Sequence, residues 1–126
     1  MLATGLYEIE ATYLMWRLAR RGGTLIDVGA NHGYYTCLWT AMRADNHVLA
    51  VEASPRCLPA LRRNVSGNGL DSVVKVLPYA AGAEAGRMAF DLGPEDQTGW
   101  GGLGGQGGRR YTLIGPDKMV EMRFGM

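Results

Sequence analysis

Residues 25–35 read Leu-Ile-Asp-Val-Gly-Ala-Asn-His-Gly-Tyr-Tyr, and this stretch decides the fold. Its first four residues form an apolar run interrupted by Asp27, which is typical of a parallel strand covered on both faces. Gly29 and Gly33 permit backbone angles that other residues avoid, and without a Cβ atom they let a ligand lie against the main chain. We therefore predict a strand that enters a tight, ligand-binding turn before a helix begins at Tyr34.

A second apolar strand is predicted from His47 to Val51, and it also ends in an acid, Glu52. Two strands that each finish in a carboxylate, with a glycine-bearing turn after the first, are typical of a nucleotide-type site at the carboxyl edge of an α/β sheet. Helix and strand patterns alternate around this pair. We expect helices over 6–20, 34–44 and 54–65, a third strand over 73–77, and a strand over 87–92 that follows a reversal at 83–86.

These elements predict an α/β fold with a Rossmann-like, doubly wound and mostly parallel sheet. The sheet is expected to be incomplete, with three βα units plus one hairpin strand. In the first helix, apolar side chains at helical spacing are expected to face the core, namely Leu6, Ile9, Tyr13 and Trp16, with Leu14 and Ala19 as further candidates.

The character of the chain changes after residue 92. The segment from Gly99 to Gly108 contains seven glycines in ten positions, too little side-chain surface to offset the entropy of ordering its backbone. We divide the chain into a Rossmann-like half-domain over 1–92 and a glycine-rich flexible loop with a short tail over 93–126, and we expect the tail to contain no helix long enough to close a sheet. The loop is either a substrate lid with Trp100 as a contact or a plain connector, and composition favours the connector.

Charge and cysteine usage exclude several classes of function. The formal net charge is +1 and the arginine pairs are dispersed, so neither a nucleic-acid partner nor an acidic membrane surface is expected. No signal peptide or membrane-spanning stretch is recognised, which predicts a cytoplasmic protein. Cys37 and Cys57 have no metal-type spacing and are interpreted as ordinary reduced residues, so no metal site is predicted.

The chemistry of the first turn narrows the choice of cofactor. The dinucleotide fingerprint is G-x-G-x-x-G, but here Asn31 stands where its middle glycine would be and Asp27 precedes its first glycine. An acid at that place would repel a pyrophosphate, whereas it suits a ligand that carries positive charge. S-adenosylmethionine has a sulfonium, an amino group and two ribose hydroxyls, and Glu52 is placed to accept hydrogen bonds from those hydroxyls.

Several short motifs together resemble a known family, the FkbM-type methyltransferases. They are Tyr7-Glu8, Ile26–Thr36, Val51–Pro55, Leu61 with Asn64, and Tyr79–Gly82 followed by Gly86. The specific part is the string D-x-G-A-N-x-G-Y-Y-T, and the resemblance covers the family's N-terminal half over about residues 5–92. It implies a class I S-adenosylmethionine-dependent fold and O-methylation of a sugar or other natural-product hydroxyl.

The resemblance also implies a set of cofactor-binding residues, and residues 1–92 would then be the S-adenosylmethionine-binding half-domain. In the first loop these residues are Asp27, Gly29, Ala30, Asn31 and Gly33; at the ribose they are Glu52 and Ala53; and near the adenine the residue is Ala80. No catalytic base is identified. The methyl acceptor is expected to be a small molecule or a glycan.

The end of the chain departs from the family pattern. The family's later strand with an Asp-Val-Glu-Gly-type motif has no counterpart here, and a fragment is favoured over a diverged complete protein. Cofactor binding is then expected to outlast turnover, and an unfinished sheet edge is expected to permit self-association. Two other functions stay open: a nicotinamide-dinucleotide-binding oxidoreductase domain, and a non-catalytic remnant that serves as an interaction module.

Individual residues of the turn also have simpler interpretations. Asp27 could cap the following helix or hold the loop in place. Asn31 could be present because asparagine tolerates left-handed backbone angles. His32 is expected to be a bystander instead of a general base, since a base must lie within hydrogen-bond reach of the substrate hydroxyl.

Overall fold

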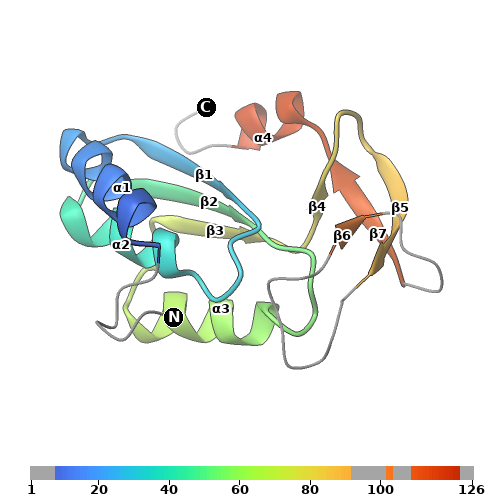
Figure 1. Cartoon of the computed structure of the whole chain (residues 1–126), viewed down its shortest axis with the longest axis horizontal. Helices are drawn as coiled ribbons and strands as arrows, with labels where there is room; N and C mark the ends of the chain where they lie inside the picture. Colours follow the sequence, from blue (N-terminus) through green and yellow to red (C-terminus); the bar gives the residue numbers. More distant parts are fainter. Residues whose placement is uncertain (1–7, 92–101, 104–108, 123–126) are drawn as a thin grey trace.

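A computed structural model describes residues 8–91, 102–103 and 109–122 of the chain, which form two sheets joined end to end (Figure 1). The first sheet is parallel, with order β1-β2-β3, and consists of β1 (Thr24–Val28), β2 (His47–Val51) and β3 (Val74–Leu77). The second is mixed, with order β4-β7-β5-β6, and consists of β4 (Ala80–Ala81), β5 (Gly86–Asp91), β6 (Gly102–Leu103) and β7 (Arg109–Ile114). The helices are α1 (Ile9–Arg21), α2 (Tyr34–Met42), α3 (Leu58–Gly67) and α4 (Pro116–Met122).

The parallel sheet confirms the predicted α/β class. Its strands lie in sequence order, and they run parallel because each is reached from the previous one by a helical crossover, α2 between β1 and β2 and α3 between β2 and β3. Ile26 pairs with Leu49, and Val48 pairs with Val74, so the three strands are in continuous register. The carboxyl ends of β1 and β2 consequently meet at one edge, where the glycine turn begins.

The core has two parts, one on each face of this sheet. Alternate residues of β2 point to opposite faces, so Val48 and Ala50 belong to one cluster and Leu49 and Val51 to the other. The first cluster is completed by residues of α1, α2 and α3, and the second by Leu77, Ile114 and Met119. Figure 1 shows α3 and α4 on opposite sides of the sheet. Because both faces are covered, β2 is an unbroken apolar run.

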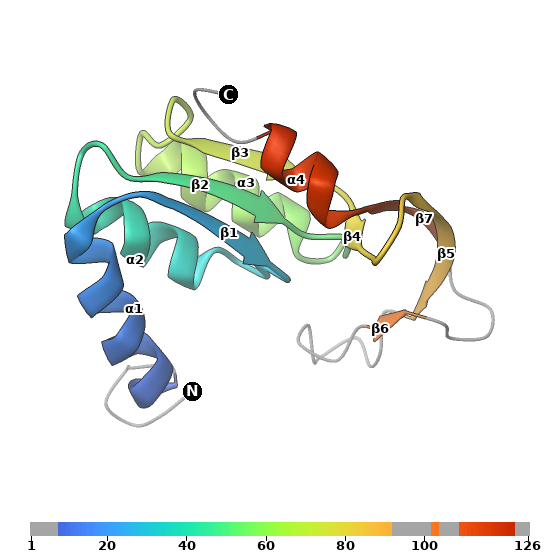
Figure 2. The ribbon, with the colours of Figure 1, turned by 90° about the horizontal axis from the view of Figure 1, so that it is seen from above.

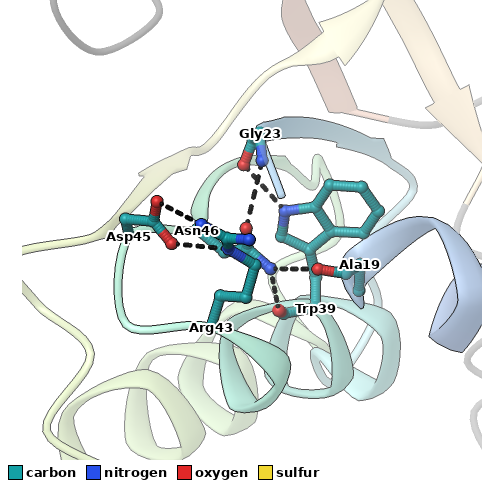
Figure 3. Close-up of polar contacts among 6 residues, drawn as sticks. All are labelled: Ala19, Gly23, Trp39, Arg43, Asp45 and Asn46. Carbon is teal, nitrogen blue, oxygen red and sulfur yellow. Dashed lines mark hydrogen bonds and ion pairs between the residues drawn. The ribbon is translucent and has the colours of Figure 1, made fainter. Parts of the chain in front are cut away.

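One buried amide joins α1, β1 and α2 (Figure 3). The Asn46 side chain is fully buried, and its Nδ2 donates to the carbonyls of Ala19 at 2.9 Å and Trp39 at 2.8 Å. Its Oδ1 accepts from the Gly23 amide at 3.1 Å, while the Trp39 indole donates to the Gly23 carbonyl at 3.0 Å. The turn before β2 therefore holds the connection between α1 and β1 in place.

Two helix predictions need correction. In α1, Ala19 is buried and Trp16 half-buried as predicted, but Ile9, Tyr13 and Leu14 are exposed; the predicted Leu6 lies outside the described residues. The third helix begins at Leu58 instead of residue 54. Ser54 is held in a turn, because its amide donates to Glu52 and its hydroxyl accepts from the Arg56 amide at 3.2 Å.

The C-terminal part differs most from expectation. The strand predicted over 87–92 is present as β5, but its partners are β6 and β7, which follow it in the chain. The tail also contains the helix α4, a short helix that the sequence patterns did not identify. Ile114 and Met119 bury their side chains against Leu49, Val51 and Leu77, and this tertiary burial stabilises a helix of seven residues. Apart from β6, the glycine-rich segment lies outside the described residues.

Candidate cofactor site at the ends of β1 and β2

The glycine turn folds across the end of β2. The amides of Gly29 and Ala30 both donate to the Val51 carbonyl, at 2.8 and 3.1 Å, and the Gly33 amide donates to the Ala30 carbonyl at 2.9 Å. The backbone is left-handed at Gly29 (φ 73°), Asn31 (φ 55°) and Gly33 (φ 93°). Asparagine is among the few residues with a side chain that tolerate such angles, so the prediction that Asn31 occupies a left-handed backbone position is confirmed.

Glu52 connects the turn to the ends of β2 and β3. Its side chain is only 7% exposed, and its Oε1 accepts from the Asn31 amide at 2.7 Å while its Oε2 accepts from the Ser54 amide at 2.8 Å. Its own amide donates to the Leu77 carbonyl at 3.0 Å. A carboxylate has about four acceptor positions. Each oxygen therefore keeps capacity for a further donor, such as a hydroxyl group of a ligand.

Asp27 is directed toward α2. Its Oδ2 accepts from the Thr36 hydroxyl at 2.7 Å, one turn into that helix. Burial raises the pKa of Asp27 above its ordinary value, the charge of Glu52 raises it further, and the hydrogen bond from Thr36 opposes both. This geometry matches the simpler interpretation, in which Asp27 holds the following helix.

The raised pKa of Asp27 leads to a testable prediction about the stability of the variant Asp27→Asn. Asp27→Asn keeps an oxygen acceptor for the Thr36 hydroxyl but removes the ionisation. The folded protein holds the proton of Asp27 more tightly than the unfolded chain does, since the pKa is raised from its ordinary value of 3.8. Ionisation of Asp27 therefore lowers the stability of the wild type as the pH rises from 3.8 through the raised pKa. We expect the variant to be more stable than the wild type at neutral pH, and this advantage to vanish as the pH falls toward 3.8. Urea unfolding from about pH 4 to about pH 7 measures it; an advantage that does not change with pH would contradict it.

Helix α3 packs against the glycine turn. Leu61 is fully buried, and a Cβ atom placed on Gly33 would lie 2.8 Å from its Cδ1. Asn64 donates from Nδ2 to the His32 carbonyl at 2.6 Å. Thr36 and Ser54, as partners of the two acids, were not predicted, and neither was this role of Asn64. A hydroxyl residue one helical turn after the glycines was the available signal for Thr36.

Seven of the eight predicted cofactor residues lie together at the ends of β1 and β2. Ala30 and Ala53 are buried there and contribute backbone to the site. Gly29 has open space where a Cβ atom would point, with no atom within 4 Å, so a ligand has room against the main chain. The eighth residue, Ala80, lies in β4 and pairs with Leu113 of β7. It follows β3 by three residues, at the same end of the parallel sheet.

The described residues also bear on a metal site and on a membrane-spanning segment. No group of three or more His, Cys, Asp and Glu side chains in the described part of the chain could hold a metal ion, and Cys37 and Cys57 are not joined by a disulfide. No helix among the described residues is long and apolar enough to cross a bilayer.

Neither a family model nor a curated protein matches the sequence. Solved structures do match the fold. The methyltransferase FkbM from Methylobacillus flagellatus KT is 17% identical, with a TM-score of 0.52 over 77% of this chain and 22% of its own. The SAH-bound methyltransferase PaMTH1 from Podospora anserina is 21% identical, with a TM-score of 0.51 over 57% of this chain and 32% of its own. A SAM-dependent methyltransferase from Agrobacterium tumefaciens is 15% identical, with a TM-score of 0.50 over 60% and 26%.

These similarities concern the fold. The chain has a methyltransferase-like α/β fold, in which a three-stranded parallel sheet of βα units is joined to a small mixed sheet. It spans about a third or less of the length of each of these structures.

Proposed function

We propose that this chain binds S-adenosylmethionine at the carboxyl ends of β1 and β2, as part of an FkbM-type methyltransferase. The observation that carries the proposal is the buried Glu52 carboxylate, which lies against the glycine turn through the Asn31 amide at 2.7 Å. A strand-end acid beside such a turn is suited to a ribose with two free hydroxyls. The proposed methyl acceptor is a hydroxyl of a sugar or another natural product.

The residues of the site fit this cofactor by their chemistry. Glu52 would accept hydrogen bonds from the ribose hydroxyls with its remaining lone pairs, and Gly29 would let the cofactor lie against the main chain. When bound, S-adenosylmethionine supplies a methyl group on a sulfonium. The part of this chain is to bind and orient the cofactor, and Asp27 contributes by holding α2 through Thr36.

Two observations support the FkbM type within the methyltransferases. The string from Asp27 to Thr36 carries the family's specific motif. In the structure its glycines and Asn31 lie in the turn between β1 and α2, and Asp27 of β1 accepts from the Thr36 hydroxyl of α2. Among the solved structures described above, the FkbM methyltransferase also aligns over the largest share of this chain, 77%.

Calorimetric titration with S-adenosylhomocysteine tests the proposal. The wild type is expected to bind, and Gly29→Ala is expected to weaken binding at least about tenfold, because a methyl group would occupy the space where the ligand lies. Gly69→Ala is the matched control. Gly69 has a similar backbone angle, φ 67° against 73°, and equally open surroundings, but it lies in the turn after α3. Both variants therefore carry the same backbone strain, and only Gly29→Ala should affect binding. Glu52 is less suitable for this comparison, since its loss would also release two backbone amides.

Each contrary outcome points to a different function. A folded wild type that releases no heat at millimolar S-adenosylhomocysteine would overturn the proposal. Binding of NADH in place of S-adenosylhomocysteine would favour the nicotinamide alternative, and binding of neither would favour a non-catalytic module. Equal binding by Gly29→Ala and Gly69→Ala would show that the ligand does not lie against the glycine turn.

A further inference from the structure

Helix α1 has an apolar side that nothing in the described part of the chain covers. Its opposite side packs inward through buried Ala19 and through half-buried Thr12, Met15 and Trp16. Leu14 and Leu18, by contrast, are 58% and 41% exposed. Figure 2 shows α1 at the border of the molecule, projecting past β1 and away from β2 and β3. The apolar side is therefore accessible to a second molecule.

The exposed residues of α1 form an ordered stripe. Ala11, Leu14 and Leu18 recur at three- and four-residue spacing, so they follow one another along a single face of the helix. Glu10 and Arg17 are also exposed and stand seven residues apart, which places both on the same border of this stripe. An apolar stripe with a charged border is the pattern by which two helices pair in water.

We propose that α1 is a dimerisation helix, which packs antiparallel against α1 of a second copy of this chain, with Leu14 near the two-fold axis. The charges favour this occupant and this direction. In an antiparallel pair Glu10 of each copy comes near Arg17 of the other, so two opposite-charge contacts flank the apolar seam. A parallel pair would instead put this charged border on opposite sides of the seam in the two copies, so Glu10 and Arg17 of one copy would not meet those of the other. The surface is thus complementary to itself in only one of the two directions.

The open edge of β1 is the other candidate for self-association. Gly29 donates toward β2, and the carbonyl of Gly23 accepts from His47 of β2, so by the two-residue period of a strand the amides of Thr24, Ile26 and Val28 point away from the sheet. Ile26 and Val28 are exposed. This edge carries no charge pattern that selects a second copy. The proposed interface therefore lies on α1, and pairing through β1 is an outcome that the experiment must separate.

Sedimentation equilibrium over a roughly hundredfold range of protein concentration tests the proposal with charge reversals. Glu10→Arg and Arg17→Glu are each expected to raise the dimer dissociation constant about tenfold, because each brings like charges together twice per dimer. The double variant Glu10→Arg with Arg17→Glu is expected to return to within about threefold of the wild type, since it recreates both opposite-charge contacts. These residues are seven apart in one helix and do not face each other within a chain, so the rescue must act between chains.

Two more variants locate the interface. Leu14→Lys is expected to abolish the dimer, since it places two positive charges at the two-fold axis, while its spacing of four residues after Glu10 favours the helix itself. Arg63→Glu, on the exposed side of α3, is the matched control and should leave the dimer unchanged. Circular dichroism checks that every variant keeps the helical content and melting temperature of the wild type.

Several results would overturn the proposal. A wild type that stays monomeric throughout the concentration range would do so, and so would a double variant that remains dissociated. A dimer that survives Leu14→Lys but separates with Ile26→Lys would move the interface to β1. A monomer that instead sediments with vesicles of anionic lipid would make α1 a membrane-surface helix. Every one of these readings is independent of cofactor binding.

Discussion

Asn46→Ala is expected to lower the free energy of unfolding by about 3 kcal/mol, as measured by urea denaturation followed by circular dichroism. The fully buried side chain makes three hydrogen bonds to the backbone, two donated to Ala19 and Trp39 and one accepted from Gly23 (Figure 3). Alanine would leave all three backbone groups without these partners. An unsatisfied buried group costs on the order of 1–3 kcal/mol. The total stays well below three such costs, because the Ala19 carbonyl keeps the Gly22 amide as a donor and Gly23 is exposed.

The neighbouring residue supplies the control for this prediction. Asp45 accepts from Arg43 at 2.8 and 2.9 Å, but both side chains are exposed, and Asp45→Ala is expected to leave the free energy of unfolding essentially unchanged. Asn46→Asp tests the chemistry at constant shape. It replaces the donating amide nitrogen by an oxygen that faces two carbonyls, so it should destabilise at least as much as alanine at neutral pH. Equal effects at positions 45 and 46 would show that the buried network does not hold α1 to the sheet.

Gly33→Ala is expected to cost about 2–3 kcal/mol of stability and to weaken S-adenosylhomocysteine binding more than about tenfold. Two effects add. A side chain at φ 93° is strained, by about 1–2 kcal/mol. In addition, the new Cβ atom would lie 2.8 Å from Leu61 Cδ1, and Leu61 is fully buried and cannot easily move. Relief of this contact would displace the turn from α3 and from Glu52.

Gly29→Ala separates the two effects. Its φ of 73° imposes similar strain, but no atom lies within 4 Å of the added methyl group. It should therefore cost about 1–2 kcal/mol, and the remaining loss in Gly33→Ala reports the contact with Leu61. A double-mutant cycle with Leu61→Val checks this assignment, because the smaller side chain should recover part of the loss. Identical stabilities for the two glycine variants would contradict it.

The three strands of the parallel sheet and the turn between β1 and α2 could be predicted from the sequence, because their signals are local. The apolar runs before Asp27 and Glu52 are short and bounded by turn residues, and parallel strands joined by helices bring their carboxyl ends to one edge. Gly29, Asn31 and Gly33 each occupy a left-handed backbone position that few other residues adopt. Strand identity and turn geometry thus depend on a few neighbouring residues.

The remaining features of the fold and of the site depend on contacts between residues that are distant in the chain. Helix α4 is too short to be stable alone, and it exists because Met119 is buried against β2 and β3. Ser54 lies outside the third helix because Glu52 accepts a hydrogen bond from its amide, and Asp27 accepts one from the Thr36 hydroxyl. Sequence alone therefore determined strand β1 and the glycine turn that follows it, since strand and turn propensities act over a few residues. Only the tertiary structure decided which helix faces are buried and what each acid holds, because burial and hydrogen-bond partners are set by residues far apart in the chain.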